Sequence, residues 1–130
     1  MKRKAGFTLM ESVIGVIILG ILVSVGIPLY RKAVLRAEDK EAKAMLKLIQ
    51  TTEKMIKLET GSYVSCTNTS QCNTNLRLNL PTSAWSYSVS ASGNNFCAQA
   101  QGGGTGTWYI NQNDGEADQN DGNAADPNDC

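Results

Sequence analysis

The most constraining feature of this chain is an uncharged run of nineteen residues, Ser12 to Tyr30, close to the N-terminus. As an α-helix this run would rise about 28 Å, close to the thickness of the hydrocarbon core of a bilayer. Three basic residues precede it, Lys2, Arg3 and Lys4. By the positive-inside rule they hold the N-terminus on the cytoplasmic side. We therefore expect a single-span membrane protein.

One carboxylate, Glu11, stands at the cytoplasmic end of this run. A carboxylate costs about 2.5 to 3.5 kcal/mol at the bilayer centre and needs a partner or a route to water. Glu11 could reach the headgroups without a partner, or it could pair with a cationic amine of another protein. The residues alone leave both alternatives open.

The junction Gly6-Phe7-Thr8-Leu9-Met10-Glu11, after its basic leader, resembles the class III signal of type IV prepilins and type II secretion pseudopilins. The resemblance implies that a prepilin peptidase and methyltransferase removes leader residues 1–6 by cutting between Gly6 and Phe7, and N-methylates Phe7. It further implies that Phe7, Thr8 and Glu11 serve subunit assembly, with Glu11 meeting the Phe7 amine of a neighbouring subunit.

Two other kinds of N-terminal segment are alternatives to this signal. An ordinary secretory signal could be cut at the small-residue triplet Ser24-Val25-Gly26, but it leaves Glu11 unexplained inside its apolar region. A permanent single-span anchor fits the apolar run, but nothing in it requires Gly6-Phe7. The pilin-like signal explains the apolar run, the Gly6-Phe7 step and Glu11.

An amphipathic pattern continues the helix over residues 31–60, after a membrane or filament-core half over residues 7–30. Apolar residues recur there at three-and-four spacing, at Val34, Ala37, Met45, Leu48, Ile49, Thr52, Met55 and Ile56. Gly61 should end the helix.

Pro28 predicts a bend in the first half of this helix. The family resemblance implies local melting between Gly20 and Pro28 inside a filament, and a plain transmembrane kink is the alternative.

Residues 61–130 should form one small domain that needs covalent staples, and they contain all four cysteines, Cys66, Cys72, Cys97 and Cys130. We favour disulfides 66–72 and 97–130, the second resembling the bridge around the C-terminal loop of many pilins, although three pairings are possible. Zinc is disfavoured, because the intervening segments of 5, 24 and 32 residues contain no Cys-x-x-Cys pair and the chain has no histidine.

Alternating apolar residues predict three antiparallel strands, at residues 85–91, 95–100 and 106–111, after a loop over residues 64–84 that carries the small disulfide. The sheet would close on the amphipathic helix. The fold class is then α+β, a type IV pilin fold. We expect its core to bury Trp85, Tyr87, Val89, Phe96 and either Trp108 or Ile110.

The segment from Asn113 to Asp129 has six carboxylates and no base. Asp114, Glu116, Asp118 and Asp121 are candidate calcium ligands, and Asp114-Gly115-Glu116 resembles the calcium loop of major pseudopilins. The EF-hand pattern fails, since Gln119 and Ala125 stand where its glycine and bidentate glutamate belong. A solvated acidic loop is the favoured alternative.

No catalytic constellation is present, so we expect a structural protein and not an enzyme. The family resemblance implies a helical homopolymer, built by an inner-membrane assembly platform and an assembly ATPase from subunits waiting in the inner membrane, and then an extracellular filament. A major pilin of a type IV pilus is the first expectation, and a major pseudopilin with a calcium loop is the alternative. Adhesion, motility and DNA uptake are possible end uses.

Charge and composition add two further expectations. Twelve basic and twelve acidic residues become nine against twelve once the leader is removed. Such a mildly acidic subunit is not expected to bind nucleic acid directly. No cofactor is required, apart from the possible calcium.

Overall fold

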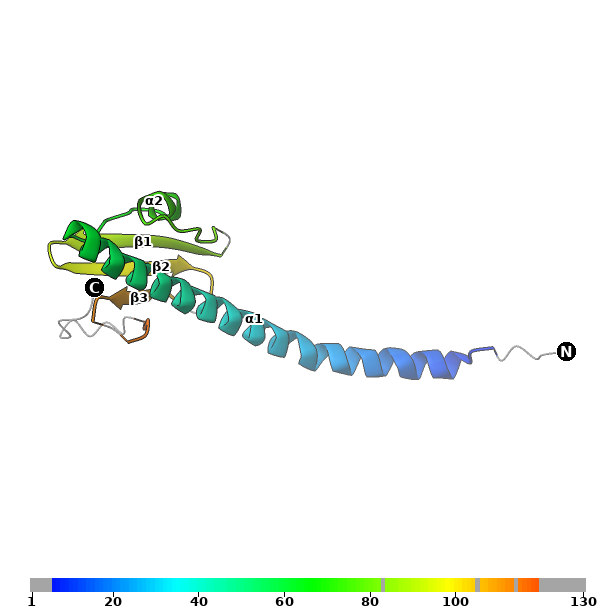
Figure 1. Cartoon of the computed structure of the whole chain (residues 1–130). Coiled ribbons are helices and arrows are strands. Elements are labelled where there is room, and N and C mark those ends of the chain that lie inside the picture. The colour runs from blue at the N-terminus through cyan, green and yellow to red at the C-terminus, as the bar shows by residue number, and fades with distance from the viewer. Residues whose placement is uncertain (1–5, 83, 105, 114, 120–130) are drawn as a thin grey trace. The chain divides into compact units, whose positions relative to one another are not determined.

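A computed structural model describes residues 6–82, 84–104, 106–113 and 115–119 of the chain. Its elements are α1 (Leu9–Thr60), α2 (Thr69–Asn75), β1 (Trp85–Ser92), β2 (Asn95–Gly102) and β3 (Trp108–Asn111) (Figure 1). The chain divides into two compact units, Met1–Val34 and Leu35–Cys130, and α1 contributes to both. The expected α+β fold, a long apolar N-terminal helix and a small antiparallel sheet, is confirmed.

The sheet of the C-terminal unit has the order β1-β2-β3, with both neighbouring pairs antiparallel. The β1–β2 hairpin pairs Trp85 with Gly102 and Ser92 with Asn95, so Gly93 and Asn94 form the turn. Gly93 has φ +59°, a backbone conformation that glycine adopts without strain. The first two strands begin at the predicted residues, whereas β3 begins at Trp108, two residues later than expected.

The core of this unit lies between α1 and the sheet. Tyr87, Val89, Trp85 and Phe96 are buried as predicted, and of the two candidates in β3, Ile110 is fully buried while Trp108 is half-buried. Buried residues alternate with more exposed ones along β1, as expected for a sheet with one face against a helix. Ala98 and Ala100 complete the inner face of β2.

The buried face of α1 differs from the predicted stripe. Ile49 is buried and Met45 and Ile56 are half-buried, but Leu48 and Met55 are 42% and 58% exposed. The buried residues of α1 are Ala42, Leu46, Ile49, Gln50 and Glu53, and of these Ile49 alone belongs to the predicted stripe.

Hydrogen bonds from the C-terminal unit to α1 explain why a different face of this helix is buried. The indole N–H of Trp85 donates to the carbonyl oxygen of Glu38 at 3.0 Å, and that of Trp108 donates to Asp39 Oδ1 at 3.1 Å. The amide of Gly104 donates to Glu38 Oε2 at 2.9 Å. Because these N–H groups are buried or half-buried and need acceptors, the helix presents its acceptor-bearing face to the sheet.

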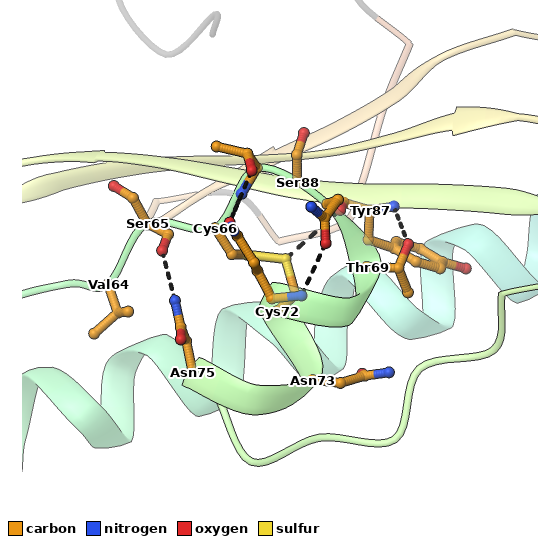
Figure 2. The surroundings of a disulfide bond; sticks show 12 residues. Val64, Ser65, Cys66, Thr69, Cys72, Asn73, Asn75, Tyr87 and Ser88 are labelled. Carbon is orange, nitrogen blue, oxygen red and sulfur yellow. Dashed lines mark hydrogen bonds between the residues drawn. A yellow bond between two sulfur atoms is a disulfide. The ribbon is translucent and has the colours of Figure 1, made fainter.

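The predicted loop over residues 64–84 was wrong in one respect, since it contains the helix α2. Asn68 caps this helix, its Oδ1 accepting from the amide of Gln71 at 2.9 Å. Cys66 and Cys72 form the predicted disulfide, with Cα atoms 5.1 Å apart. Figure 2 shows how the bridge holds α2 against β1, where Thr69 Oγ1 accepts from the amide of Tyr87 at 3.0 Å.

Candidate functional site

The candidate functional site is the N-terminal segment from Gly6 to Pro28. Gly6, Phe7 and Thr8 precede the helix and are exposed, and Phe7 is 80% exposed. A peptidase needs an accessible bond, and exposed positions outside regular structure provide one. The predicted cleavage bond between Gly6 and Phe7 meets this requirement.

Thr8 starts α1 as its N-cap. Thr8 Oγ1 accepts from the amide of Glu11 at 3.3 Å, and the carbonyl oxygen of Thr8 accepts from the amide of Ser12 at 3.2 Å. The sequence Thr-x-x-Glu is the capping-box pattern, and a carboxylate in the first helical turn is stabilised by the helix dipole. Thr8 and Glu11 therefore lie together at the start of the helix and define where it begins.

The side chains that follow Glu11 are apolar and almost without contacts. Every large apolar side chain between Phe7 and Leu29 is at least 45% exposed. By length and composition α1 could cross a membrane, and it is the one helix with this property in the part of the chain that the structure describes. Such a continuous apolar surface is not stable in water and needs lipid or other apolar helices around it.

The segment predicted to bend or melt is helical in the isolated subunit. Gly20, Ser24 and Pro28 are spaced by four residues, and Ser24 Oγ donates to the carbonyl oxygen of Gly20 at 2.8 Å. Pro28 lies inside the helix and cannot donate a backbone hydrogen bond. The weak backbone at this point is consistent with a bend, while melting in a filament stays a prediction.

A second group of site predictions falls on the C-terminal unit. Cys97 is disulfide-bonded, but its predicted partner Cys130 lies outside the described residues, as do the candidate calcium ligands Asp114 and Asp121. Glu116 and Asp118 are described and exposed. The pairing 97–130 and the calcium site therefore stay predictions.

Two of the four candidate calcium ligands, Glu116 and Asp118, can be placed in the structure. Among the described residues, no group of three or more carboxylate, cysteine or histidine side chains is placed to hold a metal. The backbone of Asp118 pairs with that of Tyr109. The carbonyl oxygen of Gly115 accepts from the ammonium of Lys47 at 2.8 Å. Because Asp114 and Asp121 lie outside the described residues, calcium binding by this loop stays a prediction.

The sequence analysis predicted the burial of Tyr87 but missed that of Glu53, and both are polar groups in the interior. Glu53 is 0% exposed; its Oε2 accepts from the amide of Val64 at 3.0 Å, and its Oε1 has no hydrogen-bond partner among the described residues. Burial raises the pKa of this carboxyl group, opposed by the hydrogen bond from Val64. Burial, with a smaller effect of the negative charge of Glu41, raises the pKa of Tyr87 to about 12. Both groups belong to the packing of the domain.

Comparison with known proteins gives two matches. A family model described as the prokaryotic N-terminal methylation motif matches residues 1–27. The type IV major pilin protein PilA of Myxococcus xanthus (strain DK1622) is 39% identical over 66 residues, which cover 51% of this chain and 30% of that protein. The match thus spans less than a third of the length of this relative. No solved structure matches the chain.

Proposed function

We propose that this chain is the major pilin, the structural subunit, of a type IV pilus, as its N-terminal methylation motif and its similarity to a type IV major pilin support. One observation carries this proposal. Among the residues that the structure describes, every large apolar side chain between Phe7 and Leu29 is at least 45% exposed. A helix of this kind is suited to lie in lipid first and against identical helices afterwards.

The proposed sequence of events begins in the inner membrane, where the subunit is held by its single span. A prepilin peptidase cuts after Gly6 and methylates the new amine of Phe7. An assembly platform and an assembly ATPase then transfer the subunit into the filament. There the apolar segments of neighbouring subunits replace lipid, and the filament emerges outside the cell.

Glu11 gives this assembly its register. The carboxylate of Glu11 lies in the first turn of α1, four residues from Phe7, whose amine becomes a cation after cleavage. Within a dry core, an isolated carboxylate is unstable, and breaking a buried ion pair by removing one partner costs about 3 to 5 kcal/mol. Subunits should therefore add where Glu11 meets the Phe7 amine of a neighbour.

The test compares Glu11→Gln with Glu11→Ala. Glutamine still completes a capping box with Thr8, so Glu11→Gln removes the charge and keeps the helix start, whereas Glu11→Ala removes both. Glu59→Gln is the matched control, because Glu59 is an exposed glutamate of the same helix in the C-terminal unit. The yield of filament sheared from the cells and the mass of the membrane-bound subunit are measured.

We expect both Glu11 variants to insert in the membrane and to be cleaved, and to give less than about a tenth of the sheared filament of the parent chain. Glu59→Gln should assemble normally. Normal filament from Glu11→Gln would overturn the pairing of Glu11 with the amine. An N-terminus other than N-methylated Phe7 on the mature subunit would overturn the proposed processing.

The second candidate function is a major pseudopilin of a type II secretion system. Its support is the motif Asp114-Gly115-Glu116, which resembles the calcium loop of such proteins. Both candidates share the cleavage and the methylation, so these do not distinguish them. If the processed protein stays in the cell envelope and none is sheared from the surface, the pseudopilin is favoured.

A further inference from the structure

Lys47 of α1 reaches a carbonyl of the acidic segment 68 residues away in sequence. Its ammonium Nζ donates to Gly115 O at 2.8 Å and to Gln50 Oε1 at 2.7 Å. Two of the three donors of the ammonium are thus used, one on the helix itself and one on the loop. A charged donor makes a hydrogen bond roughly twice as strong as a neutral one.

The buried side-chain amide of Gln50 links Lys47 to the sheet. Gln50 is only 1% exposed, and its Nε2 donates to the carbonyl oxygen of Asn111, the last residue of β3, at 2.6 Å. Asn111 Oδ1 in turn accepts from the amide of Asn113 at 2.7 Å. The start of the acidic segment is therefore joined to α1 through Gln50 and Lys47 in one hydrogen-bonded chain.

The segment also folds back along β3. The amide of Tyr109 donates to Asp118 O at 2.8 Å, and the amide of Asp118 donates to Tyr109 O at 3.1 Å. Between these two attachments Gly115 is the residue whose carbonyl oxygen faces Lys47. The positions of Asn113 and Asp118 on the sheet thus bring the loop to the ammonium.

An ion at Gly115 would have to share this carbonyl with Lys47. Calcium binds oxygen at about 2.3 to 2.6 Å, so a Ca²⁺ on the second lone pair would lie roughly 4 to 5 Å from the ammonium. At that separation a divalent and a monovalent cation repel each other, even at the effective dielectric constant of about 20 that applies near a protein surface. This repulsion opposes calcium binding at Gly115 for as long as Lys47 keeps its contact.

We propose that the ammonium of Lys47 is the cation that fastens the acidic C-terminal segment to α1, and that this segment takes no calcium through Gly115. In the sequence, the segment from Asn113 onward has six carboxylates and no base. The hydrogen bond to Gly115 O places the ammonium of Lys47 beside the start of this segment. The inference does not depend on the filament to which the subunit belongs.

The experiment measures amide hydrogen exchange by NMR on the full-length chain in detergent micelles, with 1 mM CaCl₂ or with EDTA. Lys47→Met keeps the apolar stem and removes the charge, and Lys47→Arg keeps a charged donor. Lys54→Met is the matched control, because Lys54 is exposed on the same helix and has no hydrogen bond among the described residues. The amide of Asp118 reports on the loop, and the amides of β1 and β2 report on the fold.

In Lys47→Met we expect exchange at the Asp118 amide to be at least tenfold faster, with the β1 and β2 amides unchanged. Lys54→Met should match the parent chain, and Lys47→Arg should retain most of the protection. Calcium should change none of these rates by more than twofold in the parent chain. Slower exchange with calcium in the parent chain, unchanged exchange in Lys47→Met, or equal losses in the Met and Arg variants would each overturn the proposal.

Discussion

Removal of the Cys66–Cys72 bridge should destabilise the C-terminal unit by an amount that follows from the size of its loop. The two cysteines are six positions apart in sequence. For a loop of about seven residues, the loop-entropy relation gives roughly 8 cal/mol/K, or about 2.3 kcal/mol at 25 °C. The double variant Cys66→Ala/Cys72→Ala should lower the free energy of unfolding by at least this amount, because both cysteines are also buried.

The loss should appear first in α2. This helix has seven residues, too few to be stable alone, and besides the bridge it is held by the cap of Asn68 and the hydrogen bond from Tyr87 to Thr69. Hydrogen exchange of the α2 amides should therefore accelerate before that of the sheet. The Cys66 amide, which donates to Val89 O at 2.9 Å, should be the last of this region to open.

Urea unfolding of the full-length chain in detergent micelles, followed by tryptophan fluorescence, measures the change, since Trp85 and Trp108 both lie in the sheet. Ser70→Ala, an exposed change within the same seven-residue loop, is the control and should alter stability by less than about 0.5 kcal/mol. A loss below about 1 kcal/mol in the double alanine variant would refute the reasoning, because α2 would then hold its place without the bridge.

Three further changes test the packing of the C-terminal unit. The raised pKa of Glu53 contributes stability that is fully present below the unfolded-state pKa of about 4.3 and is lost as pH rises through the folded-state pKa, with a slope of up to about 1.4 kcal/mol per pH unit. Glu53→Gln should remove this pH-dependent loss. Urea unfolding of both chains from pH 4 to pH 8 measures it, and a difference in the free energy of unfolding that stays constant over this range would contradict the prediction. Tyr87→Phe removes a buried hydroxyl that has no partner among the described residues, so chemical unfolding should show a gain of about 1 kcal/mol, and a loss would indicate a missed acceptor. Gly104→Ala should cost about 1 to 3 kcal/mol in the same assay, because φ is +60° and the new Cβ would collide with Asp39 and the ring of Trp85, whereas Gly115→Ala meets no atom within 4 Å and should be nearly neutral.

The parts of the fold that follow from local patterns could be predicted from the sequence. The apolar run after Glu11 gave the membrane-length helix, and the alternation from Trp85 with a turn at Gly93 gave the hairpin. These signals are strong because each is repeated at every second or every third to fourth residue. The local sequence is therefore sufficient to place the N-terminal helix and the hairpin along the chain.

The parts that were missed depend on single contacts. α2 is made of polar residues without apolar periodicity, and its one local signal is the capping asparagine, Asn68. The face of α1 was misjudged because counting apolar residues favours Leu48 and Met55, while the helix turns toward the sheet on account of acceptors for two indole N–H groups. The contact of Lys47 with Gly115 spans 68 residues and has no local signal.

The two units of the chain differ in what stabilises them. The C-terminal unit has a core of its own, formed by α1, α2 and the sheet, and its Cys66–Cys72 bridge and Lys47 contact lie within it. In the N-terminal unit, the large apolar side chains described between Phe7 and Tyr30 are exposed and do not form such a core. Substitutions in the C-terminal unit should therefore act through the amount of folded subunit, because a loss of 1 to 2 kcal/mol can change abundance several-fold. Substitutions between Phe7 and Pro28 should act on assembly at unchanged domain stability, and measuring both quantities for each variant separates a folding defect from an assembly defect.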